Sequence, residues 1–121
     1  MRTARLLLAA GLLWACAAAA AADAAATQRL HALFERYWEQ TAHDHPEWAT
    51  WRGDHRFDDR LSDASPAGRE AVDAREREWL AEARAFDPAA LAAMDRSSLE
   101  LFIHGRAEAV AFQPFEGWRS M

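Results

Sequence analysis

The stretch His43–Arg60, HDHPEWATWRGDHRFDDR, decides how the helices of this chain are divided. Pro46 disfavours helical geometry at the residue before it, so a helix arriving from the N-terminal side must end near His43. Pro46 can also open a short helix, because its missing N–H group is no loss in a first turn, and Gly53 can close that helix as a C-terminal cap. The stretch therefore predicts a helix end, a short helix and a polar loop.

The residues before this stretch predict a helix from about Thr27 to His43. Its apolar residues recur at i, i+3, i+4, i+7 and i+8, which places them on one face. They are Leu30, Leu33, Phe34, Tyr37 and Trp38. The spacing indicates an amphipathic helix with a single buried stripe.

The residues after the stretch predict another helix, from Ser65 to about Phe86. Ser65 offers a side-chain acceptor at the cap, and Pro66 suits the first helical turn. Its apolar residues recur every seven positions, at Val72, Trp79 and Phe86. On another face, i,i+4 spacing predicts ion pairs among Arg69, Asp73 and Arg77.

A last helix is expected over about Asp95–Phe112, after a break at Asp87-Pro88. Its apolar side comprises Leu99, Phe102, Ile103 and Val110, and Pro114 and Gly117 are expected to end it. Strand-like alternation is scarce along the chain. The predicted fold class is therefore all-α, a small helical bundle of three longer helices plus one short helix, preceded by a signal peptide.

The first 22 residues have the order of a secretory signal peptide. Arg2 and Arg5 form a short positive region, and the apolar segment from Leu6 to about Ala20 ends in an alanine run with small residues for cleavage. A transmembrane helix needs about 20 strongly apolar residues, whereas the leucine-rich part here is shorter. We expect cleavage after Ala20 or Ala22, so that residues 23–121 form the mature helical segment, exported to the periplasm or secreted.

Cys16 is the only cysteine, and its setting LLWAC partly resembles a lipoprotein signal. Trp14 departs from that pattern, which prefers a small residue there, so lipid anchoring at Cys16 is the alternative to simple export. Membrane association is expected only through such an anchor. Removing residues 1–22 removes two arginines and no acidic residue, which takes the formal net charge from −5 to −7. Such an acidic chain argues against nucleic-acid binding, which relies on clustered Lys and Arg.

The polar stretch itself holds three histidines and five carboxylates, which allows three interpretations. A zinc site needs three or four ligands at defined spacing, and His43, His45 and His55 do not provide it. An acid/base pair of Asp54 with Asp58 or Asp59 would need a cleft that the sequence does not reveal. The favoured interpretation is structural. Asp44 or His45 would cap the short helix, the aspartates would pair with Arg52, Arg56 and Arg60, and Trp48 and Trp51 would pack.

Several of these motifs together resemble the N-terminal part of the bacterial domain-of-unknown-function 885 family. They are the Leu30–Trp38 pattern, then HPEWATWRGDHRFDDRL, and then FDPAAL and MDRSSLELF. The resemblance covers about Leu30–Met121, and its most specific part is the run from Pro46 to Arg56. It implies a longer, mostly helical, exported or lipid-anchored protein similar to gluzincin-type zinc metallopeptidases.

The resemblance carries no catalytic, cofactor-binding or metal-ligating residue onto this chain, because the His-Glu-x-x-His helix of such proteins is absent from it. Zinc is therefore expected only in a full-length relative, and this chain alone is expected to be inactive. Asp54, His55 and Arg56 are implied to be structural or cleft-lining. The expected function is a non-catalytic part of the helical wall of a substrate channel, with the rest of its own polypeptide as partner. The alternative is a self-contained exported binding module.

The aromatic tail bears on this choice. Phe112, Phe115, Trp118 and Met121 follow one another in the last ten residues. Clustered exposed aromatic side chains need a partner surface. The tail therefore favours the longer protein over the self-contained module.

Overall fold

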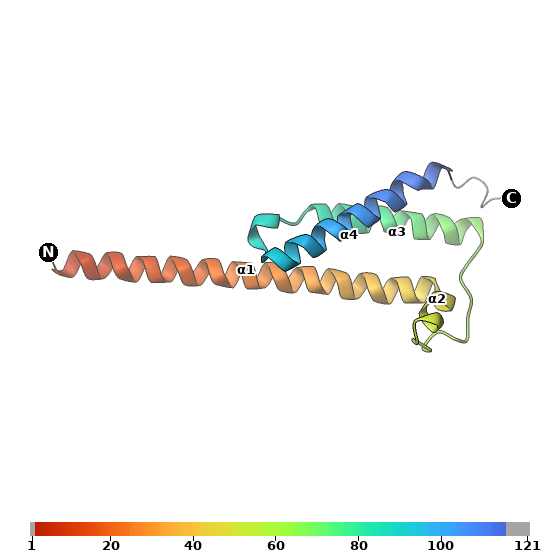
Figure 1. Ribbon diagram of the computed structural model, residues 1–121, viewed down its shortest axis with the longest axis horizontal. Helices are drawn as coiled ribbons and strands as arrows, with labels where there is room; N and C mark the ends of the chain where they lie inside the picture. Colours follow the sequence, from red (N-terminus) through yellow and green to blue (C-terminus); the bar gives the residue numbers. More distant parts are fainter. Residues whose placement is uncertain (1, 116–121) are drawn as a thin grey trace.

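The computed structural model describes the backbone of residues 2–115 and the side chains of residues 23–115. The predicted all-α class is confirmed. The elements in order are α1 (Arg2–Asp44), α2 (Pro46–Trp51), α3 (Pro66–Arg84), the short 3₁₀ helix η1 (Pro88–Ala90) and α4 (Ala93–Phe112). Figure 1 shows α3 and α4 as a pair that lies along the C-terminal half of the long helix α1.

Helix α1 begins much earlier than predicted. The sequence predicted a start near Thr27, whereas the helix is continuous from Arg2 to Asp44. No proline or glycine occurs between Leu12 and Asp44, and alanine is the strongest helix former, so the alanine run carries the helix through without interruption. The end agrees with the prediction within one residue, because Pro46 follows.

The core lies where α1 meets the C-terminal end of α3 and the N-terminal end of α4. Its buried residues are Ala26, Leu30, Leu33, Ala83, Leu91 and Leu99. Aromatic rings pack beside them: Phe102 lies 5.2 Å from Phe34 and 5.0 Å from Tyr37 between ring centroids. The predicted apolar stripe of α1 therefore supplies core residues, although Trp38 at its end is 40% exposed.

The start and end of helix α2 are set by Pro46 and Gly53, as the sequence predicted. Pro46 is fully buried at the first turn, and Gly53 has φ 89°, a left-handed conformation that an L side chain rarely adopts. The expected side-chain cap is wrong, because His45 occupies the N-cap position without a side-chain hydrogen bond to the helix, and Asp44 does not supply one either. Packing by the tryptophans is confirmed for one of the two.

Trp48 is the tryptophan of α2 that packs, with its ring 5.0 Å from that of Trp38. Trp51 is 79% exposed, because it lies on the solvent side of this six-residue helix. The packing expected of Trp51 is therefore wrong.

Helices α3 and α4 begin and end within two residues of their predicted limits. Ser65 caps α3 as expected, since its Oγ accepts the N–H of Gly68 at 3.0 Å. Asp87 caps η1 in the same way, through the N–H of Ala89 at 2.9 Å. Near the start of α4, Asp95 turns to α1 instead of capping its own helix, and accepts bonds from Thr27 and His31 at 3.0 Å each.

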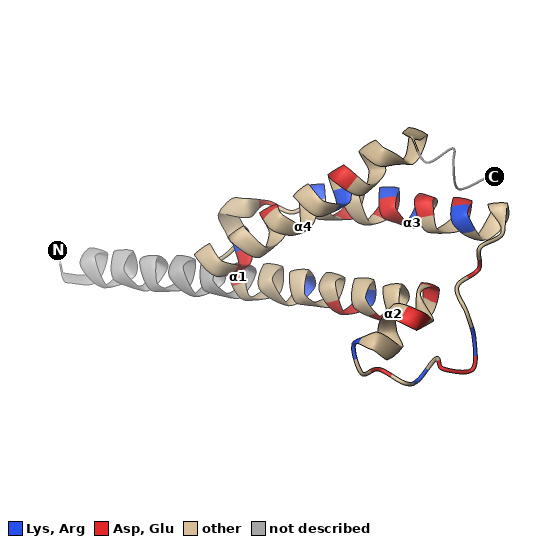
Figure 2. Cartoon of the chain, turned by 45° about the vertical axis from the view of Figure 1, so that its right-hand side comes forward, with Lys and Arg blue, Asp and Glu red and all other residues tan. Residues whose placement is uncertain are grey.

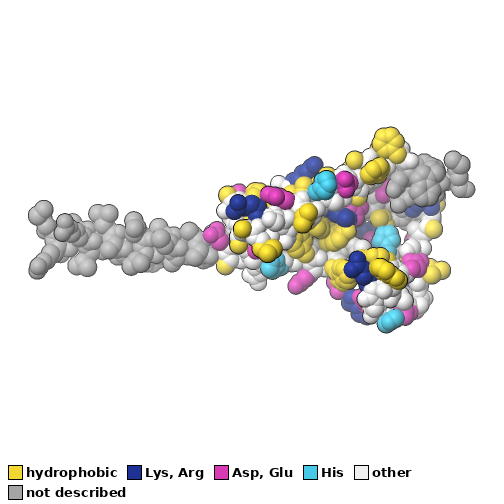
Figure 3. Space-filling model, in the orientation of Figure 1, with side chains coloured by type: hydrophobic (Ala, Val, Ile, Leu, Met, Phe, Trp, Pro, Cys, Tyr) yellow, Lys and Arg dark blue, Asp and Glu magenta, His cyan; other side chains and the backbone are white. Residues whose placement is uncertain are grey.

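Charged positions of both signs are intermixed along α3 and along the loop between α2 and α3, as Figure 2 shows. Hydrophobic side chains reach the surface over α2 and at the C-terminal end of α4 (Figure 3). Within the described part of the chain, no helix has both the length and the apolar character needed to cross a membrane.

Candidate functional site

A cavity of about 970 Å³ opens between the C-terminal end of α1 and the α3–α4 pair. We call it the interhelical cavity. Clefts that bind small molecules have volumes of about 300–1,000 Å³. Its apolar lining includes Leu61, Ala71, Val72, Ala109 and Phe112. Its charged lining includes Asp44, Arg69, Asp73, Arg75 and Glu76.

The cavity is bridged on one side by an ion pair between α1 and α3. Oδ2 of Asp44 lies 2.7 Å from Nη2 of Arg75 and accepts a bond from its Nε at 2.8 Å. Nε2 of Gln40 donates to the other carboxylate oxygen of Asp44 at 3.0 Å. The side chain of Asp44 is only 11% exposed. These bonds occupy Asp44, which explains why it does not cap α2.

A second ion pair, between α3 and α4, links the cavity to the core. Nη1 of Arg106 donates to both carboxylate oxygens of Glu76, at 2.8 and 2.6 Å. The guanidinium also lies 4.6 Å from the ring centroid of Tyr37. Burial raises the pKa of the Tyr37 phenol, and the charge of Arg106 opposes this effect. Tyr37 therefore serves here as a neutral packing group.

The ion pairs predicted along α3 are wrong. Arg69 donates from Nη1 to the carbonyl of Ala64 instead. Arg77 pairs with Glu70 at 2.9 Å and donates to Oε1 of Gln113, the residue that follows α4, at 2.7 Å. Neighbouring loop and helix acceptors have outcompeted the weak i,i+4 pairs, which are worth only about 0.2–0.5 kcal/mol each.

Asp73 is left without a cation by these rearrangements. Within residues 23–115, its carboxylate forms no ion pair or hydrogen bond, while its backbone carbonyl accepts a bond from Gln113 at 3.0 Å. The residue is half-buried and lines the interhelical cavity. The Asp73 carboxylate therefore has no counter-charge of its own within the described part of the chain.

Asp54 and Arg56 lie in the loop after α2, outside the lining of the interhelical cavity. Nη2 of Arg56 lies 2.6 Å from Oδ2 of Asp54, and its Nη1 lies 2.8 Å from Oε2 of Glu39 on α1. The hydrogen bond from Arg56 lowers the pKa of Asp54 to about 2. In this arrangement Arg56 fastens the loop to α1, and neither residue faces the cavity.

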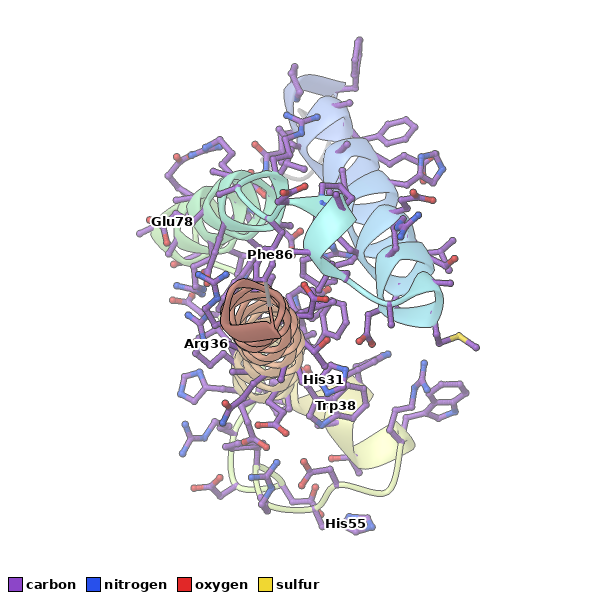
Figure 4. The ribbon with its side chains drawn as sticks, turned by 90° about the vertical axis from the view of Figure 1, so that its left-hand side faces the viewer. His31, Arg36, Trp38, His55, Glu78 and Phe86 are labelled. Carbon is purple, nitrogen blue, oxygen red and sulfur yellow. The ribbon has the colours of Figure 1, made fainter. Side chains whose placement is uncertain are left out.

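His55 is held by its own pair of partners. Oδ2 of Asp58 lies 2.9 Å from Nδ1 of His55, and Oδ1 of Asp58 accepts the Thr50 hydroxyl at 2.5 Å. The Thr50 bond first, and then the His55 bond, lower the pKa of Asp58. An ionised carboxylate only accepts, so Nδ1 must carry the proton. Figure 4 shows His55 in the loop, directed away from the helices.

The sequence predicted that the loop aspartates pair with Arg52, Arg56 and Arg60, and the structure contains some of these pairs. Asp54 pairs with Arg56, and Asp59 lies 3.4 Å from Arg60. Asp58 instead contacts Thr50 and His55, because the tight turn at Gly53 brings it back over α2. The acid/base pair of Asp54 with Asp58 or Asp59 does not form, because the carboxylate of Asp54 is bound by Arg56.

A zinc ion does not fit the described residues. Among the side chains of residues 23–115, no group of three His, Cys, Asp or Glu residues converges closely enough to hold a metal ion. His43 and His55 each contact an aspartate at 3.3 and 2.9 Å instead. Cys16 lies in the part of α1 whose side chains are not described, so lipidation there stays a prediction.

The sequence analysis named several residues that line the cavity, such as Asp44, Val72 and Asp73, but did not predict that they come together. Asp44 and Arg75 are 31 positions apart, and Glu76 and Arg106 are 30 apart, so no local spacing links them. The sequence contains one indication of the cavity. Arg75 and Glu76 are charged, although they lie between Val72 and Trp79 on the otherwise apolar side of α3.

Comparison with known proteins identifies one family. A family model described as a bacterial protein of unknown function (DUF885) matches residues 46–121. No curated protein and no solved structure matches the chain.

Proposed function

The chain belongs to the DUF885 family of bacterial proteins, and on this basis we propose that it forms part of the helical wall of a substrate cleft. In this proposal the chain is the N-terminal, non-catalytic portion of an exported, peptidase-like protein. The rest of the same polypeptide completes the cleft and supplies any zinc-dependent chemistry. The described residues supply the binding surface and the helical framework.

The observation that carries the proposal is the interhelical cavity. Its lining comes from α1, the loop before α3, α3 itself and α4, so the packing of all three long helices shapes it. It combines apolar residues with charged groups that are fixed by ion pairs, such as Asp44 with Arg75. Fixed polar groups in an apolar surround are typical of ligand-binding clefts.

Exposed apolar side chains on α4 and just after it support contact with further polypeptide. Met94 is 78% exposed, Leu101 72%, Phe112 61% and Phe115 77%. Met94, Leu101 and Phe112 are spaced by multiples of the helical repeat, which places them along one face of α4. Large exposed apolar surfaces mark contact sites. Trp118 and Met121, which the sequence grouped with these aromatic residues, lie outside the described residues.

Export of the mature segment is compatible with the packing. Ala26 is the first core residue among the described side chains, so cleavage after Ala20 or Ala22 leaves the described core complete. A cut after Ala22 would also leave Asp23 at the new helix start, where a negative charge is favourable. These features support the periplasmic or secreted location that the signal sequence predicts.

The test combines the natural reading frame with a pair of matched variants on α4. We expect the reading frame to continue past Met121 and its full-length product to hydrolyse peptides. Ala109→Trp fills the cavity and should reduce kcat/KM at least tenfold, because Ala109 lines it. Ala111→Trp places the same side chain outside the cavity lining and about 100° around the helix from the exposed face that carries Phe112, and should leave the activity unchanged.

A reading frame that ends at Met121 would overturn the proposal and favour a self-contained binding module. A full-length product without peptidase activity would overturn the peptidase assignment. Equal loss of activity in both variants, with both folded by circular dichroism, would show that the cavity is not part of the substrate cleft.

A further inference from the structure

We propose that the interhelical cavity selects peptide segments that carry an arginine or lysine side chain, with Asp73 as its charge partner. This inference rests on the proposed function, since it names the substrate class of the same cavity.

The charges that line the cavity are balanced, with one exception. Arg75 is paired with Asp44 at 2.7 Å, and Glu76 with Arg106 at 2.6 Å. These pairs cancel, so neither leaves a charge for a ligand. Three further charged residues line the cavity: Arg60 lies 3.4 Å from Asp59, and the charge of Arg69 acts on the carboxylate of Asp63. The carboxylate of Asp73 has no such partner within residues 23–115.

The nearest arginines along α3 are held by other partners. Arg69, one turn before Asp73, donates to the carbonyl of Ala64, and Arg77, one turn after it, pairs with Glu70. Arg77 also donates to Gln113, and Gln113 donates to the carbonyl of Asp73. These bonds hold Arg77 away from the Asp73 carboxylate while fixing the α3 backbone against the end of α4.

The same cavity also has an apolar lining. Val72, Ala109 and Phe112 line it together with Asp73. Lysine and arginine carry three or four methylene groups that pack on apolar surface while the charged end reaches a polar partner. A half-buried carboxylate also discriminates strongly by charge, because an acidic ligand would lose hydration and meet a like charge. The lining therefore fits a long basic side chain better than a neutral or acidic one.

The experiment measures binding of three dye-labelled peptides to the full-length protein by fluorescence anisotropy, with EDTA present to suppress metal-dependent hydrolysis. The peptides are acetylated and amidated pentapeptides, Ala-Leu-X-Leu-Ala, with Arg, Gln or Glu at X. We expect the Arg peptide to bind about tenfold more tightly than the Gln peptide, and the Glu peptide to bind more weakly than both. Asp73→Asn should remove the preference for Arg over Gln while leaving binding of the Gln peptide unchanged.

Glu78→Gln is the matched control. It removes one negative charge from the same helix, but Glu78 is exposed and lies outside the cavity lining. Figure 4 shows Glu78 on the side of α3 that is turned away from α4. This variant should keep the full preference for the Arg peptide.

The outcomes separate this inference from the proposed function. If the Arg and Gln peptides bind equally well, the role of Asp73 is wrong while the cleft stands. If Glu78→Gln weakens the preference as much as Asp73→Asn does, the overall charge of the protein is responsible, and the inference is overturned. If none of the three peptides binds, the cavity is not a peptide cleft, and both proposals fail.

Discussion

Nη2 of Arg75 lies 2.7 Å from Oδ2 of Asp44, so the middle of α3 is fastened to the last residue of α1. The core packs α1 against the opposite ends of α3 and α4, around Leu33 and Leu99. The ion pair therefore stabilises the end of the bundle where the interhelical cavity opens.

Arg75→Met should lower the free energy of unfolding by about 1–2 kcal/mol, between the values typical of exposed and of buried ion pairs. The two side chains are 31% and 11% exposed, which places the pair between those classes. The measurement is urea denaturation followed by circular dichroism. Arg84→Met is the control, because Arg84 is exposed on the same helix and forms no ion pair within residues 23–115. Equal loss in both variants would contradict a specific role for the pair.

The core of α1 gives a second prediction. Leu33 is fully buried, whereas Leu101 on α4 is 72% exposed. Leu33→Ala should destabilise the fold by about 2–5 kcal/mol, since it removes buried methyl groups and leaves a cavity. Leu101→Ala should change the stability by less than about 0.5 kcal/mol. Urea midpoints of the two variants check this. A large loss of stability in Leu101→Ala would show that this face of α4 is packed against another surface.

Much of the helical framework could be predicted because local residues determine it. Pro46 ends α1, Gly53 closes α2, and Ser65 caps α3, and each acts through its own backbone geometry or a hydrogen bond three residues away. The start of α1 could not be predicted in the same way. The alanine run has helical propensity but no periodic apolar stripe, so the spacing of the apolar residues predicted a start only at Thr27.

The cavity could not be predicted, because its polar contacts join residues on different helices. The spacing of Asp73 to its neighbours indicated ion pairs along α3, but Gln113 just after α4 and the carbonyl of Ala64 compete for the same arginines. Only the packing of α4 against α3 brings Gln113 to that position. Tertiary contacts thus reversed a prediction that the helical repeat alone supported.

The bond between Arg56 and Asp54 predicts a pH dependence. Arg56 lowers the pKa of Asp54 from 3.8 to about 2 in the folded chain. A carboxyl group whose pKa is lowered by folding stabilises the fold above its unfolded pKa, and this contribution is lost as the pH falls. The stabilising contribution of Asp54 should therefore be complete above about pH 4 and disappear as the pH falls towards 2.

Arg56→Gln should return the pKa of Asp54 towards 3.8, since the largest cause of the shift is removed. Carbon NMR titration of the Asp54 carboxyl group measures this directly. Arg84→Gln is the control and should leave the titration unchanged. An Asp54 pKa that stays near 2 in Arg56→Gln would show that the backbone of the loop, and not the guanidinium, holds it low.

Processing of the N-terminus gives another prediction. Expressed in a Gram-negative host, the chain should lose about 2 kDa, as expected for removal of roughly 20 residues, and begin at Ala21 or Asp23. N-terminal sequencing of the periplasmic product checks this. Retention of Met1 would contradict cleavage. Lipid label that is incorporated and then lost in Cys16→Ala would instead show anchoring through Cys16.

Two glycines separate the effect of backbone conformation from that of packing. A Cβ added at Gly53 or at Gly105 would meet nothing within 4 Å, so neither site excludes alanine by contact. Gly53 has φ 89° in the turn after α2, whereas Gly105 lies inside α4 without a positive φ. Gly53→Ala should therefore lower the free energy of unfolding by about 1–2 kcal/mol, the cost of a left-handed L residue. Gly105→Ala should raise it by up to about 1 kcal/mol, because alanine is the better helix former.

Urea denaturation of the two variants measures both changes. Equal destabilisation would show that another part of the polypeptide packs closely against Gly105. The contact surface of α4 would then include this glycine.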